Sequence, residues 1–256
     1  MANKVKFMDL RVNDSRERES LLKVFNRVMD HGQFIMHKEV HDFEDAFSKY
    51  CGRRYCAGVD SGTSALFIAL KGMKIGLGDE VITTSLSWIA TANAIAMTGA
   101  TPVFCDIGED LNIDPTSVER MITKKTRAIL VVHYTGRIVD IDAFIALSEK
   151  YGIPLVEDAA QAFGSKYREK VAGSFGYVGC FSMNPMKVLA ACGEAGAIVT
   201  DDNELHERII ALRYNGTLNK EVCIQPSLNG RLDSLQAGIL VERLRDVNKK
   251  ILKIRN

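Results

Sequence analysis

The sequence predicts an α/β protein whose mostly parallel β-sheet is covered by helices on both faces. First, short apolar runs of strand length alternate along the chain with patterns of helical spacing. Second, the helical segments between these runs are about ten residues long, as in βαβ units, which place neighbouring strands parallel. Third, with 256 residues and 46% apolar content the chain can bury a substantial core, as one large domain or as one domain with an appendage.

The N-terminal part of the chain is predicted to be helical. A charged stretch near residues 14–28 has a helix-like pattern, and the next helix lies in the segment HKEVHDFEDAFSKYCG. Gly52 is expected to end this second helix, because glycine readily adopts the left-handed conformation found at helix C-termini. Apolar side chains recur in the segment at spacings of three and four, at Val40, Phe43, Phe47 and Tyr50.

The alternation of strands and helices begins after Gly52. The predicted strands are YCAGV, EVITT, TPVFCD, RAILVVH and IPLVED, and the predicted helices between them cover residues 63–73, 88–97 and 141–151. Two further strands, YVGCFSM and GAIVT, lie close enough in sequence to form a hairpin around Lys187, which would break the simple alternation. A helix over residues 203–214 follows them.

The last part of the chain is predicted to be one long helix. Its apolar residues recur at helical spacing, and the sequence ends within this pattern without a glycine or proline stop signal. The recurring residues from Arg231 onward are Leu232, Leu235, Ile239, Leu240, Leu244, Val247, Ile251 and Ile254.

Charge and composition favour a small-molecule partner over a nucleic acid or a membrane. The net charge is +1, and the 33 basic residues are interspersed with the 32 acidic ones. The N-terminus has no apolar signal-peptide core, and no apolar run reaches the roughly 18 residues that a membrane span needs. We therefore expect a cytoplasmic protein.

The cysteines are predicted to be reduced thiols and not zinc ligands or disulfide partners. No C-x-x-C pair occurs, and the five histidines do not cluster with the cysteines at zinc-ligand spacing. We therefore expect no metal site. The six cysteines are Cys51, Cys56, Cys105, Cys180, Cys192 and Cys223.

Lys187 is the first candidate for chemistry. It follows a strand that reads as buried, and the acidic run VEDAAQAFG lies about one supersecondary unit upstream. Lysine amines condense with carbonyl groups, so this residue could hold pyridoxal phosphate covalently and later move its proton. The alternative is that Lys187 is one of the many solvated surface lysines.

Asp158 is the second candidate, because it ends the apolar strand IPLVED. Ligands of open α/β sheets bind at the carboxyl ends of the strands, where a carboxylate could pair with a protonated pyridine nitrogen. By strand alternation Glu157 should point the other way, and Gln161 could face the same ligand from the following loop. The alternative role for Asp158 is to cap the start of a following helix.

Gly62 and Thr63, in DSGTSAL, are candidates for phosphate binding. A strand gives way there to a helix, and the free N–H groups of the first helical turn bind phosphate without a charged side chain. The alternative is an ordinary helix N-cap, for which serine and threonine are common. The segment is neither a P-loop nor a dinucleotide fingerprint.

Two aromatic side chains follow other strands at the same predicted edge. Trp88, the only tryptophan, could stack on the face of an aromatic cofactor, although lone tryptophans more often fill cores. His133 has a similar position, but it could equally be a histidine whose hydrogen bonds are satisfied within the fold.

In combination these motifs resemble the DegT/DnrJ/EryC1/StrS family of pyridoxal-phosphate-dependent sugar aminotransferases. The resemblance covers about residues 30–250. It rests on the ordered segments GVDSGTSAL, SLSWIATANAI, TGATPVFCDI, VEDAAQAFGSKY, GSFGYVGCFSMNPMK, GEAGAIVTDD and LNGRLDSLQAGIL.

The resemblance implies a fold, a reaction and a role for each matching residue. The expected fold is the fold type I large domain with a sheet of about seven strands, and the expected reaction is amination of a nucleotide-linked keto sugar, with glutamate as amino donor, in amino-sugar and polysaccharide biosynthesis. Lys187 would bind the cofactor covalently and Asp158 would pair with its ring nitrogen. Trp88 would stack on the ring, and Gln161 would approach the phenolic oxygen. Gly62, Thr63 and Ser182 match the phosphate-binding positions, and Asn229 matches an asparagine that reaches the neighbouring site of a homodimer.

The resemblance also implies a division of the chain and shows three departures. Residues 1–30 would be an N-terminal helical segment, residues 31–236 the cofactor-binding domain, and residues 237–256 the start of a helix leading to a small C-terminal domain that this chain lacks. Without that domain, we expect part of the apolar stripe of the last helix to be exposed and to promote association. Thr135 stands where an aromatic residue usually precedes Gly136, and Met36 stands where glycine usually follows the Phe-Ile pair.

Two further functions stay open at this point. The chain could be a binding or regulatory homologue that is folded and dimeric but catalytically weak. It could also resemble the sugar dehydratases of the family, but those replace the cofactor-binding lysine with histidine, and Lys187 counts against this function.

Overall fold

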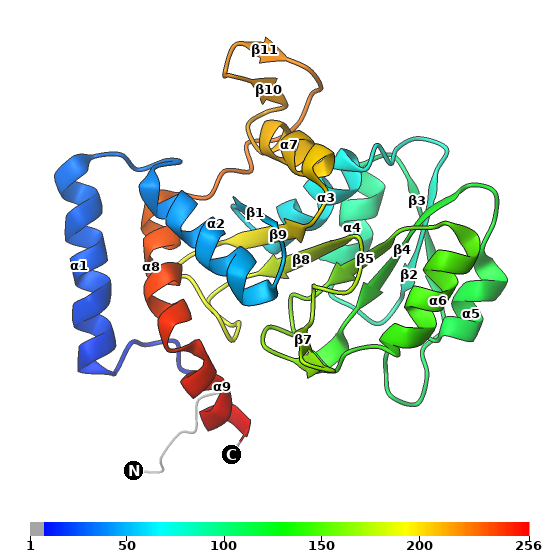
Figure 1. The fold of residues 1–256 in the computed structure, drawn as a ribbon, viewed down its shortest axis with the longest axis horizontal. Coiled ribbons are helices and arrows are strands. Elements are labelled where there is room, and N and C mark those ends of the chain that lie inside the picture. The colour runs from blue at the N-terminus through cyan, green and yellow to red at the C-terminus, as the bar shows by residue number, and fades with distance from the viewer. Residues whose placement is uncertain (1–7, 256) are drawn as a thin grey trace.

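The computed structural model describes residues 8–255 and confirms the predicted fold class (Figure 1). Seven strands form one sheet in the order β1-β9-β8-β5-β4-β2-β3. Only β9 is antiparallel to its neighbours, so the expected hairpin of β8 and β9 around Lys187 is confirmed. The strands are β1 (Tyr55–Val59), β2 (Glu80–Thr84), β3 (Thr101–Cys105), β4 (Thr126–Val132), β5 (Leu155–Asp158), β8 (Val178–Ser182) and β9 (Gly196–Thr200).

Helices cover both faces of the sheet, as predicted, because the strands are apolar on both sides. Along β4, Leu130 packs into the core beneath one helical layer, whereas Ile129 and Val131 pack into the core beneath the other. The first layer comprises α3 (Gly62–Gly72), α4 (Ala90–Met97) and α7 (Asn203–Leu212). The second comprises α2 (Lys38–Cys51), α8 (Ser234–Arg245), α5 (Pro115–Met121) and α6 (Ile141–Tyr151).

Several short elements were not predicted from the sequence. The helix α5 has a clear start signal, since Asp114 caps it and Pro115 occupies its first turn. Two small hairpins extend from the sheet, one of β6 (Lys166–Tyr167) with β7 (Lys170–Val171) and one of β10 (Thr217–Leu218) with β11 (Val222–Cys223).

The C-terminal region corrects two expectations. The predicted long helix is two helices, because α8 ends at Arg245 and α9 (Val247–Arg255) begins after Asp246. The apolar stripe is also largely covered: Leu240 and Val247 are buried, and Ile251 packs against the same core cluster. The break at Asp246 lets α9 turn onto the domain, so the expected exposed patch does not form along most of the stripe.

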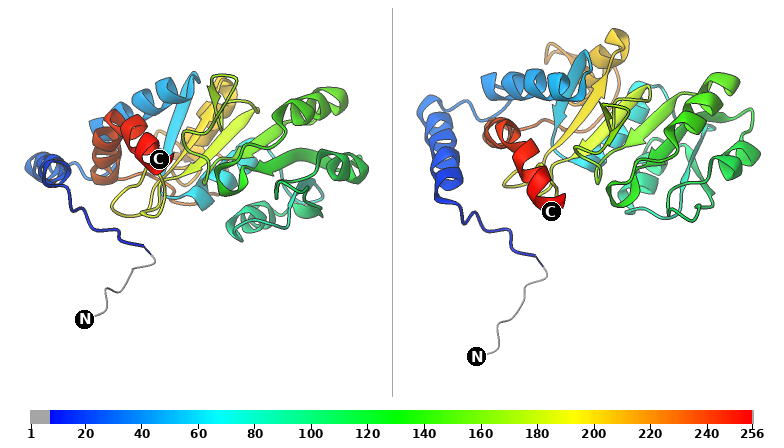
Figure 2. Two further views of the ribbon diagram at one scale, coloured as in Figure 1. Left: turned by 90° about the horizontal axis from the view of Figure 1, so that it is seen from below. Right: turned by 60° about the horizontal axis from the view of Figure 1, so that its bottom comes forward.

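The N-terminal helix α1 (Ser15–His31) lies at one end of the molecule and packs against α8 (Figure 2). Asp14 caps its start and Gly32 its end. Among the described residues, none of the helices combines the length and the apolar character that crossing a membrane requires.

A buried ion pair fixes the first strand of the sheet. Glu44 of α2 and Arg213 form a salt bridge, and both hold Gly58 of β1. The Gly58 N–H donates to Glu44 Oε1 at 2.8 Å, and Arg213 Nη1 donates to the Gly58 carbonyl oxygen at 2.8 Å. Each charge is paired with its partner and bonded to the Gly58 backbone, so the buried pair positions the strand that leads into Ser61.

Candidate functional site

A hollow of about 590 Å³ lies at the carboxyl ends of the parallel strands, the edge at which open α/β sheets bind ligands. Its wall is formed where β1, β2, β5 and β8 end. The hollow brings together every candidate cofactor-binding residue of the sequence except Asn229, namely Gly62, Thr63, Trp88, Asp158, Gln161, Ser182 and Lys187.

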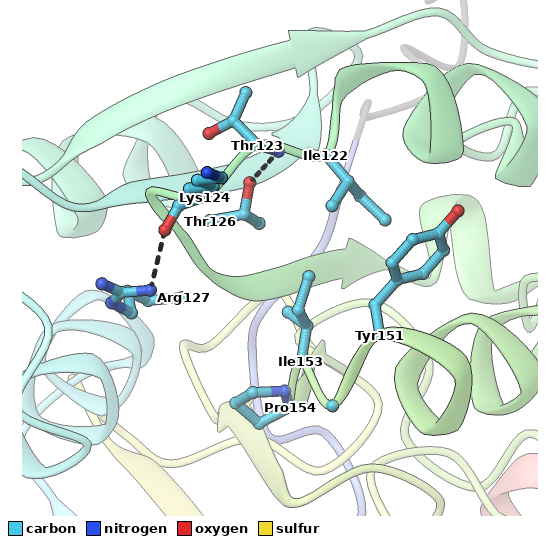
Figure 3. A pocket seen from close by; sticks show the side chains of 9 residues that line it. Ile122, Thr123, Lys124, Thr126, Arg127, Tyr151, Ile153 and Pro154 are labelled. Carbon is cyan, nitrogen blue, oxygen red and sulfur yellow. Dashed lines mark hydrogen bonds between the residues drawn. The ribbon is translucent and has the colours of Figure 1, made fainter.

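A second hollow, of about 620 Å³, lies at the opposite edge, where β4 and β5 begin (Figure 3). Several of its polar groups bond to other protein groups: Thr123 N–H donates to Thr126 Oγ1 at 2.9 Å, and Arg127 Nη1 donates to the Lys124 carbonyl oxygen at 3.1 Å. We therefore assign the functional site to the hollow at the carboxyl edge.

The N-terminus of α3 forms one end of the site. The N-cap residue Ser61 accepts the N–H of Ser64 at 3.1 Å. Among the described residues no acceptor is bound to the N–H groups of Gly62 and Thr63, and both residues line the hollow. A Cβ atom on Gly62 would lie 2.6 Å from the Cβ of Ser182, so only glycine lets the helix start this close to β8. Two open donors and a serine hydroxyl fit an anionic group such as phosphate.

Asp158 forms the floor of the site. It is buried, its Oδ1 accepts the Ala160 N–H at 3.1 Å, and its Oδ2 accepts the Thr91 hydroxyl at 2.9 Å. Burial raises the pKa of Asp158 above its usual value, although these two hydrogen bonds and the charges of His133 and Lys187 oppose the shift. Turns and not a helix follow β5, so the alternative role as a helix cap is wrong.

Lys187 lies in the loop that connects β8 to β9, and its side chain is half-buried where it lines the hollow. Its N–H donates to the Asn184 carbonyl oxygen at 2.8 Å. Two side chains of α8 bond to the later part of this loop. Gln236 Oε1 accepts the Cys192 N–H at 2.8 Å, and Arg243 Nη1 donates to the Ala190 carbonyl oxygen at 2.5 Å. The lysine is therefore carried by a loop anchored to the domain and is not a freely solvated surface residue.

Trp88 and Gln161 stand at the rim. The indole is 74% exposed, so the alternative role of Trp88 as a core residue is wrong. Gln161 Oε1 accepts the Thr135 N–H at 3.0 Å, which leaves its NH₂ group as the donor available to a ligand. Thr135 has a φ of 53°, an uncommon conformation for a β-branched residue.

Glu157 and His133 lie on the other side of β5, as strand alternation predicts for Glu157. His133 Nε2 is 2.8 Å from Glu157 Oε2, and the same carboxylate accepts N–H groups of Gly173 and Gly176 at 2.8 and 2.6 Å. Burial opposes ionisation of Glu157, but His133 and the N–H donors outweigh it and lower the pKa of Glu157. The histidine is fully buried, so of its two possible roles the structural one applies.

Asn229 lies outside the hollow and is exposed. Its Oδ1 accepts Arg231 Nε at 2.6 Å, and its backbone bridges to Tyr214. Within one chain it therefore does not take part in the site.

Two histidines and a glutamate meet where α1 joins α2, a grouping that the sequence spacing did not reveal. Ligand atoms of His31, His37 and Glu39 all lie within 4.8 Å of one another. The Nδ1 of His31 accepts the Gln33 N–H at 3.0 Å, so its Nε2 carries the proton and faces Glu39 Oε1 at 3.4 Å. Arg27 Nε also donates to Glu39 Oε1, at 3.2 Å. Because the Arg27–Glu39 hydrogen bond joins α1 to α2, we assign this cluster a structural role.

Five polar residues that line the hollow could not be identified from the sequence, although they stand inside or next to motifs that contain candidate residues. Asn184 Nδ2 donates to Glu194 Oε1 at 2.6 Å, a hydrogen bond that joins the two ends of the loop that carries Lys187. The five are Ser61, Ser87, Thr91, Asn184 and Glu194. Adjacency to a candidate residue in a motif was the only signal in the sequence.

The chain matches the model of the DegT/DnrJ/EryC1/StrS aminotransferase family over residues 15–256. It is 39% identical to the UDP-2-acetamido-2-deoxy-3-oxo-D-glucuronate aminotransferase of Pseudomonas aeruginosa, over 96% of this chain and 69% of the relative. It is 42% identical to the dTDP-3-amino-3,6-dideoxy-alpha-D-galactopyranose transaminase of Aneurinibacillus thermoaerophilus, over 94% of this chain and 66% of the relative.

Two solved structures share the fold closely. The structure of S. venezuelae DesV in complex with a ketimine intermediate superposes with a TM-score of 0.92 at 41% identity, covering 96% of this chain and 66% of DesV. NtdA from Bacillus subtilis, solved with bound cofactor PMP, superposes with a TM-score of 0.91 at 32% identity, covering 97% of this chain and 57% of NtdA. The chain thus spans about two thirds of the length of the relatives it matches.

Proposed function

Because the chain belongs to the DegT/DnrJ/EryC1/StrS aminotransferase family, we propose that it transfers an amino group from an amino acid to a nucleotide-linked keto sugar. One observation carries this proposal: a single hollow gathers a lysine amine, a buried carboxylate and the open N-terminus of a helix. These are the groups that pyridoxal phosphate requires for its aldehyde, its ring nitrogen and its phosphate.

The residues of the hollow fit this cofactor. Gly62, Thr63 and Ser182 would hold the phosphate, since a Cβ at position 62 would fill the space between α3 and Ser182. Asp158 would pair with the ring nitrogen. Trp88 would cover one ring face, Gln161 would donate to the phenolic oxygen, and Lys187 would bind the aldehyde carbon. When bound, the cofactor supplies an electron sink for negative charge on the reacting carbon.

Lys187 and Asp158 have different proposed roles in catalysis. The Nζ atom of Lys187 would act as the general base that moves a proton between the substrate carbon and the cofactor's C4′ carbon, which is general acid–base catalysis by a positioned amine. The carboxylate of Asp158 is buried at the floor of the hollow and would stabilise positive charge on the ring nitrogen of the bound cofactor. The exposed indole of Trp88 keeps water from one face.

We propose a nucleotide-linked keto sugar as acceptor and glutamate as donor. The two relatives named above act on UDP- and dTDP-linked sugars, which supports the class of acceptor. The open rim at Trp88 and Met186, both exposed, leaves room for a ligand much longer than one sugar. We also place the protein in the cytoplasm, since its six cysteines are free thiols.

The direct test follows the cofactor spectrum and the products. The purified chain is incubated with pyridoxal phosphate, and the absorption spectrum is recorded before and after glutamate is added. We expect an absorption band of the bound cofactor, and a shift of this band when glutamate is added. When a UDP- or dTDP-linked keto sugar is also present, we expect 2-oxoglutarate and the amino sugar to form. Binding without conversion would favour the binding or regulatory function, and no binding would refute the proposal.

We further propose that the working form is a homodimer in which Asn229 of one copy reaches the phosphate of the other. The exposed position of Asn229 outside its own hollow supports this arrangement. The variants Lys187→Ala and Asn229→Ala are each expected to be impaired, whereas their mixture, unfolded and refolded together, should regain activity. Each mixed dimer contains one site with both residues intact. A mixture no more active than its components would contradict the shared site.

A further inference from the structure

We propose that Thr91, backed by Ser87, is a positioning residue that fixes the carboxylate of Asp158 beneath the cofactor ring. This inference rests on the proposed function, because it assigns a task to the groups that hold Asp158. The three side chains form a continuous chain: Ser87 Oγ lies 2.7 Å from Thr91 Oγ1, which lies 2.9 Å from Asp158 Oδ2.

The donor and acceptor roles in this row of hydrogen bonds follow from the chemistry of Asp158. An ionised carboxylate only accepts hydrogen bonds, so the single hydroxyl proton of Thr91 goes to Asp158. Thr91 must then accept from Ser87, and Ser87 therefore donates. Both hydroxyls thus point their hydrogen-bond dipoles toward Asp158, and each donor strengthens the next.

The position of Thr91 argues against a purely helical role. A threonine within a helix commonly turns its hydroxyl to the carbonyl three or four residues earlier. Thr91, the second residue of α4, instead donates to a residue that lies 67 positions away. It is 2% exposed, so no water competes for this hydrogen bond.

These hydrogen bonds also determine the orientation in which the Asp158 carboxylate faces a ligand. Ala160 N–H holds Oδ1 and Thr91 holds Oδ2, so the carboxylate plane is fixed and one lone pair of each oxygen remains for the site. Burial raises the pKa of Asp158 and the Thr91 hydrogen bond opposes that shift. Without the hydroxyl, Asp158 would keep a proton for itself more readily and share less negative charge with the ring nitrogen.

The same turn carries Trp88. Because the indole is 74% exposed, packing contributes little to its placement. Ser87 and Thr91 flank Trp88 and are bonded to each other, and Thr91 is bonded to Asp158. One turn therefore positions both the indole and the carboxylate.

The test compares Thr91→Val, Thr91→Ser and Ser87→Ala in the full chain, reconstituted with pyridoxal phosphate labelled with nitrogen-15 in the ring. Thr98→Val is the matched control, because Thr98, the C-cap of α4, also has a hydroxyl that bonds inside the protein, to the Ile95 carbonyl oxygen at 2.7 Å. The readouts are the nitrogen-15 shift of the bound ring, cofactor affinity, kcat and KM.

We expect Thr91→Val to move the ring nitrogen shift toward that of a neutral pyridine and to lower kcat about ten- to hundredfold, as for one hydrogen bond to a charged group, with little change in KM. Ser87→Ala should move the shift the same way by less, and Thr91→Ser and Thr98→Val should match the wild type. A wild-type shift in Thr91→Val, or failure of Thr91→Ser to restore it, would overturn the inference. A wild-type chain that binds no cofactor would instead refute the proposed function.

Discussion

Replacing Lys187 with alanine is expected to abolish covalent attachment of pyridoxal phosphate and to lower turnover by about a thousandfold or more, since both the nucleophile and the proton carrier are lost. In the wild-type chain, borohydride reduction followed by peptide mapping should place the pyridoxyl adduct on Lys187. This lysine combines attachment to an anchored loop with a position in the same hollow as Asp158.

Lys170→Ala is the matched control for this experiment. Lys170 lies on the small hairpin of β6 and β7, close to Lys166 in space, and does not line the hollow. Its loss should leave both the adduct and the turnover unchanged. An adduct that maps to Lys166 or Lys170 would remove Lys187 from the proposed mechanism.

The order of strands and helices could be predicted because each element carries its own signal. The strand RAILVVH is apolar on both faces and becomes β4, and helix 141–151 is found with the bounds read from its spacing. The meeting of Lys187 with Asp158 was also predictable in outline, since both follow strands that end at one edge.

What the sequence could not show depends on contacts between distant segments. The residues around Thr91 do not indicate its hydrogen bond to Asp158, because the two residues are distant in the chain. Hydroxyl residues are also common at the starts of helices, whatever their function. The break at Asp246 has no glycine or proline signal either. It arises because Val247 and Ile251 pack against the core cluster of α2 and the β8–β9 region, a tertiary interaction that overrides a continuous helical pattern.

Asp158→Asn is expected to lower turnover about a hundredfold or more while cofactor occupancy and folding change little. A neutral amide cannot keep the ring nitrogen charged, so the cofactor would lose its capacity as an electron sink, although the proposed binding groups at Gly62, Ser182 and Lys187 remain. The comparison needs kcat, the cofactor dissociation constant and a thermal unfolding curve. Asp140→Asn, at the exposed N-cap of α6, is the control for the same chemical change away from the hollow.

The surroundings of the carboxylate allow folding to survive Asp158→Asn. The amide oxygen can still accept the Ala160 N–H, and the Thr91 hydroxyl can rotate to accept from the new NH₂ group while donating to Ser87. Because burial raises the pKa of Asp158, its ionised form costs stability in the cofactor-free protein once the pH exceeds the unfolded-state pKa. An uncharged asparagine lacks this cost, so the cofactor-free variant should unfold at the wild-type temperature or above it at neutral pH. Full turnover in this variant would exclude Asp158 from the mechanism, and a large loss of thermal stability would show that its charge has a structural partner.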